Sequence, residues 1–439
     1  MPEYLAPGVY VEEVSFRSKS IEGVPTSTTG FAGMTRYGPV AYPNGPLSVE
    51  PRLMTSFTEF ERMYGGLEHL RAPAGEDRIP YTPHAARAFF MNGGKRLYIS
   101  RVFTPRGTDW GVASLATAVS GTTATWRARW PGEYGNALVK VIWLRSKNLA
   151  FDDGGTVQIR RARHGAMVEI FPPGPLPVDT VAPVIGNLAE IDVNPATGKQ
   201  RFSRGGAFIT PAATDQIVLV ELTVQVWPNG DVPPMSYTEL GVSPNHKRYI
   251  GKILQREDPE DEAAVVWLDW DPGLATGNDR AANLMVALCQ KDPVRLQGGH
   301  DGNVATASDL KGKEADPDVV TIKATGLAAL GDIDDIAIVA LPDSGTLESE
   351  LEAKLSVDYL IAHAENLKYR IAVVDGREQS SMTEIRRYRG QFDSKYAAFY
   401  HPWIEILDPI ERATQGAPPM RILLPPSGFA TGIYARSDI

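Results

Sequence analysis

The amino-acid sequence predicts a multidomain α+β protein: an α/β core with a buried sheet and βαβ units, interrupted by an inserted β-rich domain. Apolar runs separated by helical segments follow residue 319, a pattern typical of parallel strands buried on both faces. Residues 104–243 are rich in Thr, Val, Gly and Pro and contain several strand-like runs. The length of 439 residues suits about three domains, since one domain takes roughly 150 residues.

The N-terminal segment predicts one extended strand, because the side chains of residues 5–14 alternate between two faces. A polar stretch, residues 15–20, follows directly, so no partner strand lies nearby in the sequence. The strand is therefore expected to pair with a distant segment or with another chain; an edge strand of its own domain is an equal alternative. The residues of this N-terminal arm are Tyr4, Leu5, Val9, Tyr10, Val11 and Val14.

Two helices and a strand are predicted next. Residues 56–59 (SFTE) have the form of a capping box, and aromatic residues at helical spacing lead from there to Gly65. A second helix is expected to begin at Thr82 and Pro83, to bury apolar residues between 86 and 90, and to end at Gly93. Residues 97–103 alternate as a strand.

The inserted domain is expected to contain strands at residues 156–160, 167–171 and 216–227, with a surface turn at the proline-rich residues 171–177. In the second part of the core, strands are predicted at 336–341, 371–374 and 396–406, with a helix in each gap. The first of these helices shows a four-residue spacing, and the second opens with a capping box at 381–384. The spaced residues are Leu347, Leu351, Leu355 and Tyr359.

Composition excludes several classes of function. Lys+Arg 44 against Asp+Glu 53 gives a net charge of −9, which argues against nucleic acid as a partner. The single cysteine forms no intrachain disulfide or thiolate metal site, and the seven histidines are scattered without ligand spacing. No apolar run approaches the roughly 20 residues of a membrane span, and no secretory h-region follows Met1. The sequence therefore predicts no cofactor and no metal.

Candidate reactive groups have simpler structural explanations. Cys289 lies in an apolar helical run, where a packed thiol is expected. Ser427 follows two prolines, but it lacks the G-x-S-x-G elbow and has no histidine near it in sequence. Residues 296–303 (LQGGHDGN) specify a tight turn with positive φ angles, either a chain reversal or a ligand loop. The chain is therefore predicted not to be an enzyme.

Five segments in order resemble the contractile tail sheath family of myophages, R-type pyocins and phage-tail-like extracellular injection systems. They are residues 4–14 with 21–33, residues 57–65 with 89–94 and 98–102, residues 131–136 (PGEYGN), residues 298–302 (GGHDG), and residues 395–403 with 424–436 (LPPSGFATGIYAR). The resemblance marks turns at Gly132, Asn136, Gly298, Gly299, Asp301, Gly302, Pro425, Pro426, Ser427 and Gly428. Residues 160–280 contribute little to it, as expected of a variable outer decoration.

The resemblance implies an N-terminal extended arm at 1–20, a core at 21–105 and 290–439, and one or more outer domains at 106–289. It implies a structural subunit that polymerises as stacked rings around an inner tube and contracts to drive the tube through a cell envelope. Other sheath subunits, the inner tube protein, the baseplate and the tail terminator would be its partners, without nucleic acid or membrane contact. Its location would be the virion tail or injection particle, assembled in the bacterial cytoplasm.

Family members continue into a further C-terminal domain where this sequence ends, so the chain itself is expected to be monomeric and the C-terminal domain and arm to be absent. The competing interpretation is a carbohydrate-binding or hydrolytic β-domain, residues 104–243, carried on an α/β scaffold. Paired carboxylates in a cleft would favour that alternative.

Overall fold

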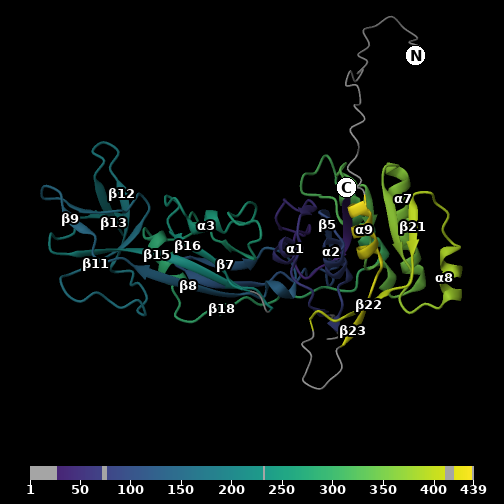
Figure 1. Cartoon of the computed structure of the whole chain (residues 1–439). Helices are drawn as coiled ribbons and strands as arrows, with labels where there is room; N and C mark the ends of the chain where they lie inside the picture. Colours follow the sequence, from purple (N-terminus) through teal and green to yellow (C-terminus); the bar gives the residue numbers. More distant parts are fainter. Residues whose placement is uncertain (1–26, 72–76, 231–232, 411–419, 438–439) are drawn as a thin grey trace, which may run out of the picture.

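The structure is a computed structural model that describes residues 27–71, 77–230, 233–410 and 420–437. Figure 1 shows an elongated molecule, with an α/β core at one end and a long β-rich insertion extending away from it. Both the first and the last described residues belong to the core. The predicted N-terminal arm lies outside the described residues.

The core is built on a six-stranded sheet with the order β2-β5-β1-β19-β20-β21. All neighbouring pairs are parallel except β2 and β5. The strands are β1 (Thr28–Met34), β2 (Arg52–Met54), β5 (Arg96–Val102), β19 (Ile338–Ala340), β20 (Ile371–Asp375) and β21 (Ala397–Tyr400). The predicted parallel sheet is therefore present, and β1 lies at its centre, where the order of the strands reverses.

Helices cover both faces of this sheet, which explains why its strands are apolar on both sides. One face carries α1 (Phe57–Tyr64), α2 (Tyr81–Met91) and α9 (Ser427–Ser437). The other face carries α5 (Ala307–Lys311), α6 (Gly326–Ala329) and α7 (Glu350–Leu367). Helix α8 (Met382–Arg389) connects β20 to β21 and buries Ile385 and Tyr388.

The capping predictions are confirmed in part. The Ser56 hydroxyl accepts a hydrogen bond from the Glu59 amide, but the Glu59 carboxylate accepts from the Thr55 amide rather than from the cap residue. The box at the start of α8 is complete, with Ser381 and Glu384 bonded reciprocally. Helix α2 begins at Tyr81, two residues before the predicted first helical position, so that Pro83 is its third residue, where no intrahelical amide bond is required.

The predicted apolar stripe of α7 is confirmed in part, because Leu347 is buried and Leu355 and Tyr359 pack, half-buried, against the core. Leu347 precedes the helix, and Leu351 is 64% exposed. A spacing of exactly four residues drifts by about 40° per step around a helix of 3.6 residues per turn, so such a row leaves the buried face. The buried face consists instead of Ala353, Ser356, Val357, Leu360, Ile361 and Ala364.

The insertion contains an eight-stranded antiparallel sheet with the order β14-β13-β12-β11-β15-β8-β18, with β16 also paired to β15. Its strands are β8 (Leu138–Arg145), β11 (Met167–Phe171), β12 (Leu188–Val193), β13 (Gln200–Arg204), β14 (Ala207–Ile209), β15 (Gln216–Trp227), β16 (Met235–Leu240) and β18 (Val294–Arg295). Strands β11 and β15 match their predicted bounds. Pairing of β18 with β8 extends this sheet beyond residue 289.

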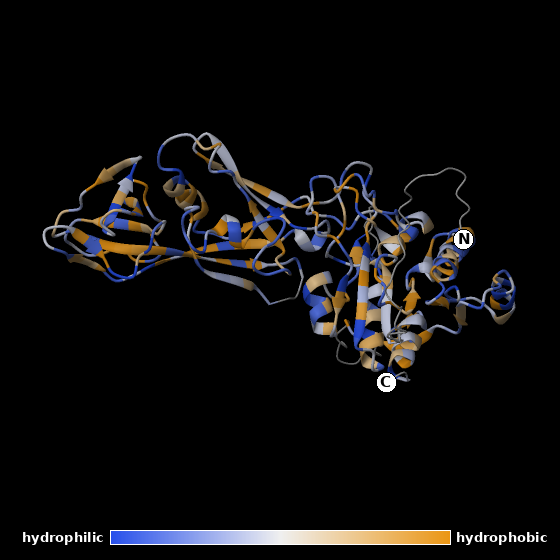
Figure 2. Ribbon diagram, turned by 90° about the horizontal axis from the view of Figure 1, so that it is seen from above, coloured by the Kyte–Doolittle hydropathy of each residue, from blue (hydrophilic) through white to orange (hydrophobic). Residues whose placement is uncertain are grey.

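Smaller elements complete the insertion. A three-stranded sheet has the order β17-β7-β6, and a hairpin pairs β9 with β10 where a strand was predicted at 156–160. Their bounds are β6 (Ser114–Val119), β7 (Thr122–Ala128), β9 (Ala150–Asp152), β10 (Val157–Ile159) and β17 (Val266–Asp269), with helices α3 (Ile250–Ile253) and α4 (Arg280–Leu288). Figure 2 shows hydrophobic and hydrophilic residues interspersed along the insertion strands, as expected where one face packs on a core.

The strand predicted at 396–406 is two strands in different sheets. After β21 the chain turns at His401 and Pro402, and β22 (Ile404–Leu407) then pairs with β23 (Arg421–Leu424). Pro402 has no amide to continue the ladder, and the Trp403 indole Nε1 donates to the Gly376 carbonyl at 2.6 Å. The remaining elements are β3 (Leu70–Arg71), β4 (Asp77–Arg78) and the short 3₁₀ helices Glu133–Gly135 and Ser344–Thr346. None of the helices in the described ranges is long and apolar enough to cross a membrane.

Candidate functional site: the junction of core and insertion

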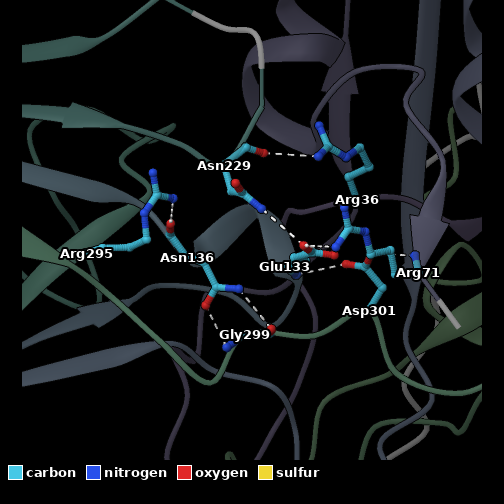
Figure 3. Close-up of polar contacts among 8 residues, drawn as sticks. All are labelled: Arg36, Arg71, Glu133, Asn136, Asn229, Arg295, Gly299 and Asp301. Atoms are coloured by element: carbon cyan, nitrogen blue, oxygen red, sulfur yellow. Dashed lines mark hydrogen bonds and ion pairs between the residues drawn. The ribbon is translucent and has the colours of Figure 1, made fainter. Parts of the chain in front are cut away.

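Two of the three predicted turns, 131–136 and 298–302, meet where the insertion joins the core (Figure 3). The Asn136 side-chain Nδ2 donates to the Gly299 carbonyl at 3.0 Å, and the Gly299 amide donates to Asn136 Oδ1 at 2.8 Å. A Cβ on Gly299 would lie 2.5 Å from the Gly132 carbonyl oxygen. Only glycine therefore permits this approach of the two turns.

Asp301 ties the same junction to the core. Its Oδ1 accepts from the Glu133 amide at 2.8 Å, and its Oδ2 accepts from the Arg71 amide of β3 at 3.0 Å. The residue is only 9% exposed, so these two backbone amides take the place of the water molecules that would otherwise hydrogen-bond to the carboxylate. The predicted positive φ angles occur at Gly298 (92°) and Gly302 (74°).

A polar network beside Asp301 links further parts of core and insertion (Figure 3). Arg36 Nη2 donates to the Asn229 carbonyl at 3.0 Å, and Arg36 Nη1 lies 3.0 Å from Glu68 Oε2. Arg71 Nη1 lies 3.4 Å from Glu133 Oε1, which also accepts from Asn229 Nδ2 at 3.3 Å. Each carboxylate of this network therefore has a basic partner.

Tyr37 makes the buried part of the junction. Its hydroxyl donates to the Val265 carbonyl at 2.6 Å and accepts from the Trp130 amide at 2.9 Å, which bonds the segment after β1 to the insertion. Burial raises the pKa of Tyr37 far above its ordinary value, so the hydroxyl remains a donor. The neighbouring Arg129 guanidinium donates to three carbonyls, those of Arg256, Glu257 and Glu262, and burial lowers its pKa.

The third predicted turn lies elsewhere, at the start of α9. Ser427 is fully buried, and its amide donates to Asp375 Oδ1 at 2.7 Å at the carboxyl end of β20. A Cβ on Gly428 would lie 2.5 Å from Ala85 Cα, so the turn sets the close approach of α9 to α2. Pro425 and Pro426 precede the helix. Because Ser427 is closed off from solvent, this turn has the geometry of a packing element rather than of a nucleophile.

The other candidate reactive groups are also packed. Cys289 is buried, and burial raises the pKa of its thiol to about 12, so little thiolate forms near neutral pH. His363 is held beside Arg370, and burial lowers its pKa to about 4. In the part of the chain that the structure describes, no three His, Cys, Asp or Glu residues are grouped as a metal site would need.

A cleft of about 400 Å³ adjoins the junction and is lined by Glu68, Asp77, Glu133 and Asp408 among other residues. Such a group of carboxylates bears on the hydrolase alternative. Two of them, Glu68 and Glu133, are engaged by Arg36 and Arg71. The arrangement therefore resembles an ion-pair network that joins two bodies more than a pair of acid and base catalysts.

Sequence reasoning missed Arg36, Tyr37, Arg71, Arg129 and Asn229. The one available signal was Arg36-Tyr37, two large polar residues that begin two positions after the end of β1. Comparison of the sequence with protein-family models and with curated proteins found no match in either. A proposal about function therefore has to rest on the geometry of the junction.

Proposed function

We propose that this chain is a structural subunit of a contractile tail sheath, which polymerises around an inner tube and contracts to drive it through a cell envelope. The observation that supports the proposal most is the meeting of turns 131–136 and 298–302, two of the segments on which the resemblance depends. Chance similarity of two short motifs would not require them to be in contact. Their contact is expected if both belong to one conserved joint between a core and an outer domain.

The architecture suits such a subunit. The insertion is long and projects from the core, and β1, the first described strand, lies in the core sheet. Sheath subunits have to rotate relative to one another while they stay connected. Rigid domains joined by extended segments allow this, because a strand that pairs with a neighbouring subunit can stay paired while the chain bends at a hinge beside it. The polar residues 15–20 are the proposed hinge.

Deletion of residues 1–14 from the full-length protein tests the proposal. We expect a folded monomer by circular dichroism and light scattering, but no sheath by electron microscopy. A double substitution, Val9→Pro with Val11→Pro, should act in the same way, because it removes backbone donors from the arm without shortening it. Lys147→Ala, at an exposed position of the insertion outside the arm and the hinge, is the control and should assemble normally. Normal sheaths from the deletion would refute the role of the arm, and the absence of any sheath from the undeleted protein would refute the sheath function.

A further inference from the structure

A cavity of about 820 Å³ opens outside the carboxyl end of β5, next to the strand at which the sheet order reverses. Its walls are residues 40–47, the segment from Arg101 to Trp110, the segment from Ser308 to Gly326, and Arg256 of the insertion. Open α/β sheets bind ligands in this position, and small-molecule sites typically enclose about 300–1,000 Å³. Location and size are therefore those of a ligand site.

Arg101 supplies a buried positive charge at this cavity. The side chain is 3% exposed, and its Nη1 donates to the Gly38 carbonyl at 3.0 Å. Within the described residues its Nε and Nη2 have no hydrogen-bond partner. Burial lowers the pKa of the guanidinium only to about 10, so it is charged at neutral pH. A buried cation with two free donors is costly unless an anion binds it.

The charge of Asp301 raises the pKa of Arg101, but Asp301 makes no hydrogen bond with its guanidinium, because its two oxygens accept backbone amides. The single acidic residue among those described in the cavity lining is Asp309, whose Oδ2 accepts three hydrogen bonds from Thr104 and Thr306. Neither carboxylate therefore accepts a hydrogen bond from Nε or Nη2 of Arg101.

Lys313 adds a second positive charge. Its backbone is fixed, because its amide donates to Thr325 Oγ1 at 3.0 Å and its carbonyl accepts from the Thr325 amide at 2.9 Å. The other two cationic side chains of the cavity form ion pairs. Arg256 Nε lies 2.8 Å from Glu257 Oε1, and Lys323 Nζ lies 3.3 Å from Glu50 Oε1. The residues left to bind an anion are thus Arg101 and Lys313.

An aromatic wall lies beside these cations. The rings of Phe103 and Trp110 are stacked with centroids 6.0 Å apart, and Tyr42 lies 6.3 Å from Trp110. The Arg101 guanidinium lies over Phe103, 5.2 Å from the ring centroid. Such a wall favours a planar, apolar group through stacking.

We propose that this cavity binds an oxyanion carried on a planar ring, with Arg101 and Lys313 binding the oxyanion and Trp110 and Tyr42 packing against the ring. Either a free aryl phosphate or carboxylate, or an aromatic residue next to acidic residues of another copy, supplies this chemistry. Residues 10–13 (YVEE) have that composition. The inference does not depend on the sheath function.

Titration of the full chain with phenyl phosphate tests the site, with inorganic phosphate and phenol as partial ligands. We expect calorimetry to detect phenyl phosphate binding at least about tenfold tighter than that of either part, and a concentration-dependent rise in Tm. Lys313→Glu and Trp110→Ala should each weaken binding about tenfold or more. Lys147→Glu, an exposed lysine of the insertion, is the matched control and should leave binding unchanged. Arg101→Gln should abolish binding where it folds.

Absence of phenyl phosphate binding, or equal affinity in wild type, Lys313→Glu and Trp110→Ala, would overturn the inference. A peptide of residues 4–14 then distinguishes the two sources of the ligand. Displacement of phenyl phosphate by the peptide indicates a second copy as the natural occupant. Binding of phenyl phosphate without displacement indicates a free small molecule.

Discussion

The side-chain amide of Asn136 exchanges two hydrogen bonds with the backbone of Gly299, which lies 163 residues further along the chain. The intervening chain contains every strand of the insertion except β6 and β7. Because closing a loop of this length costs conformational entropy, the contacts at its neck determine whether the insertion stays docked. The first two predictions concern this neck.

Asn136→Ala removes both hydrogen bonds and leaves the amide and carbonyl of Gly299 without partners. We expect a loss of about 2 kcal/mol in the free energy of unfolding, since each unpaired group costs about 1–3 kcal/mol where it is shielded from water. Urea denaturation measures this loss. Asn366→Ala, at an exposed position of α7, is the control and should be neutral or slightly stabilising. Equal midpoints for the two variants would contradict the role of Asn136.

Asp301→Asn is expected to destabilise almost as much as Asp301→Ala, by about 3 kcal/mol. The carboxylate accepts from two backbone amides, whereas an asparagine offers one acceptor and points its own NH₂ group at the second amide. Both variants also leave the charge of buried Arg101 without a nearby carboxylate. Asp292→Asn, an exposed change, should have no effect. Wild-type stability of Asp301→Asn would contradict the need for two acceptor oxygens at this position.

Strands with one buried face could be predicted from the sequence. Strand β15 extends over Gln216–Trp227 as expected, because alternation along a half-buried strand follows directly from the pleat. The prediction failed where tertiary contacts determine the end of an element. At Pro402 an apolar run continues through a change of sheet, and at Leu351 an apolar residue of α7 is exposed. Neither event changes the local apolar pattern.

The junction could be predicted only as two separate turns. Glycines at 298 and 302 indicate backbone with positive φ, which is a local property. The pairing of Asn136 with Gly299 uses a backbone amide and carbonyl, and Arg36 likewise donates to the carbonyl of Asn229. Backbone groups are the same in every residue, so such partners leave no trace in the sequence of a single chain.

Gly428→Ala should detach α9 from α2. The added Cβ would lie 2.5 Å from Ala85 Cα and 2.7 Å from the Ala85 carbonyl oxygen, so one helix has to move. We expect a loss of about 1–3 kcal/mol, the usual cost of overpacking, and faster amide exchange in α9. Gly186→Ala is a matched control, because nothing lies within 4 Å of its added Cβ, and it should be neutral or stabilising. Equal protection of α9 in both variants would contradict the prediction.

Asp375 should make stability decline as the pH rises from about 4 to about 7. The carboxyl group is 2% exposed, and burial raises its pKa to about 7, while the Ser427 amide donates to it. Between the ordinary pKa near 3.9 and about 7, the folded state holds a proton that the unfolded state has lost. The proton-linked stabilisation is therefore complete at low pH and is lost through pH 7, by at most about 4 kcal/mol.

Asp375→Asn removes this titration and keeps an acceptor for the Ser427 amide. We therefore expect the stability of wild type relative to Asp375→Asn to fall between pH 4.5 and pH 8, as measured from urea midpoints. His84 and His363, whose pKa values burial lowers to about 4, give the opposite slope below pH 6.5, but they are common to both proteins and cancel in the difference. Asp292→Asn should keep the wild-type profile. Parallel profiles for wild type and Asp375→Asn would mean that the carboxyl group is ionised throughout, despite its burial.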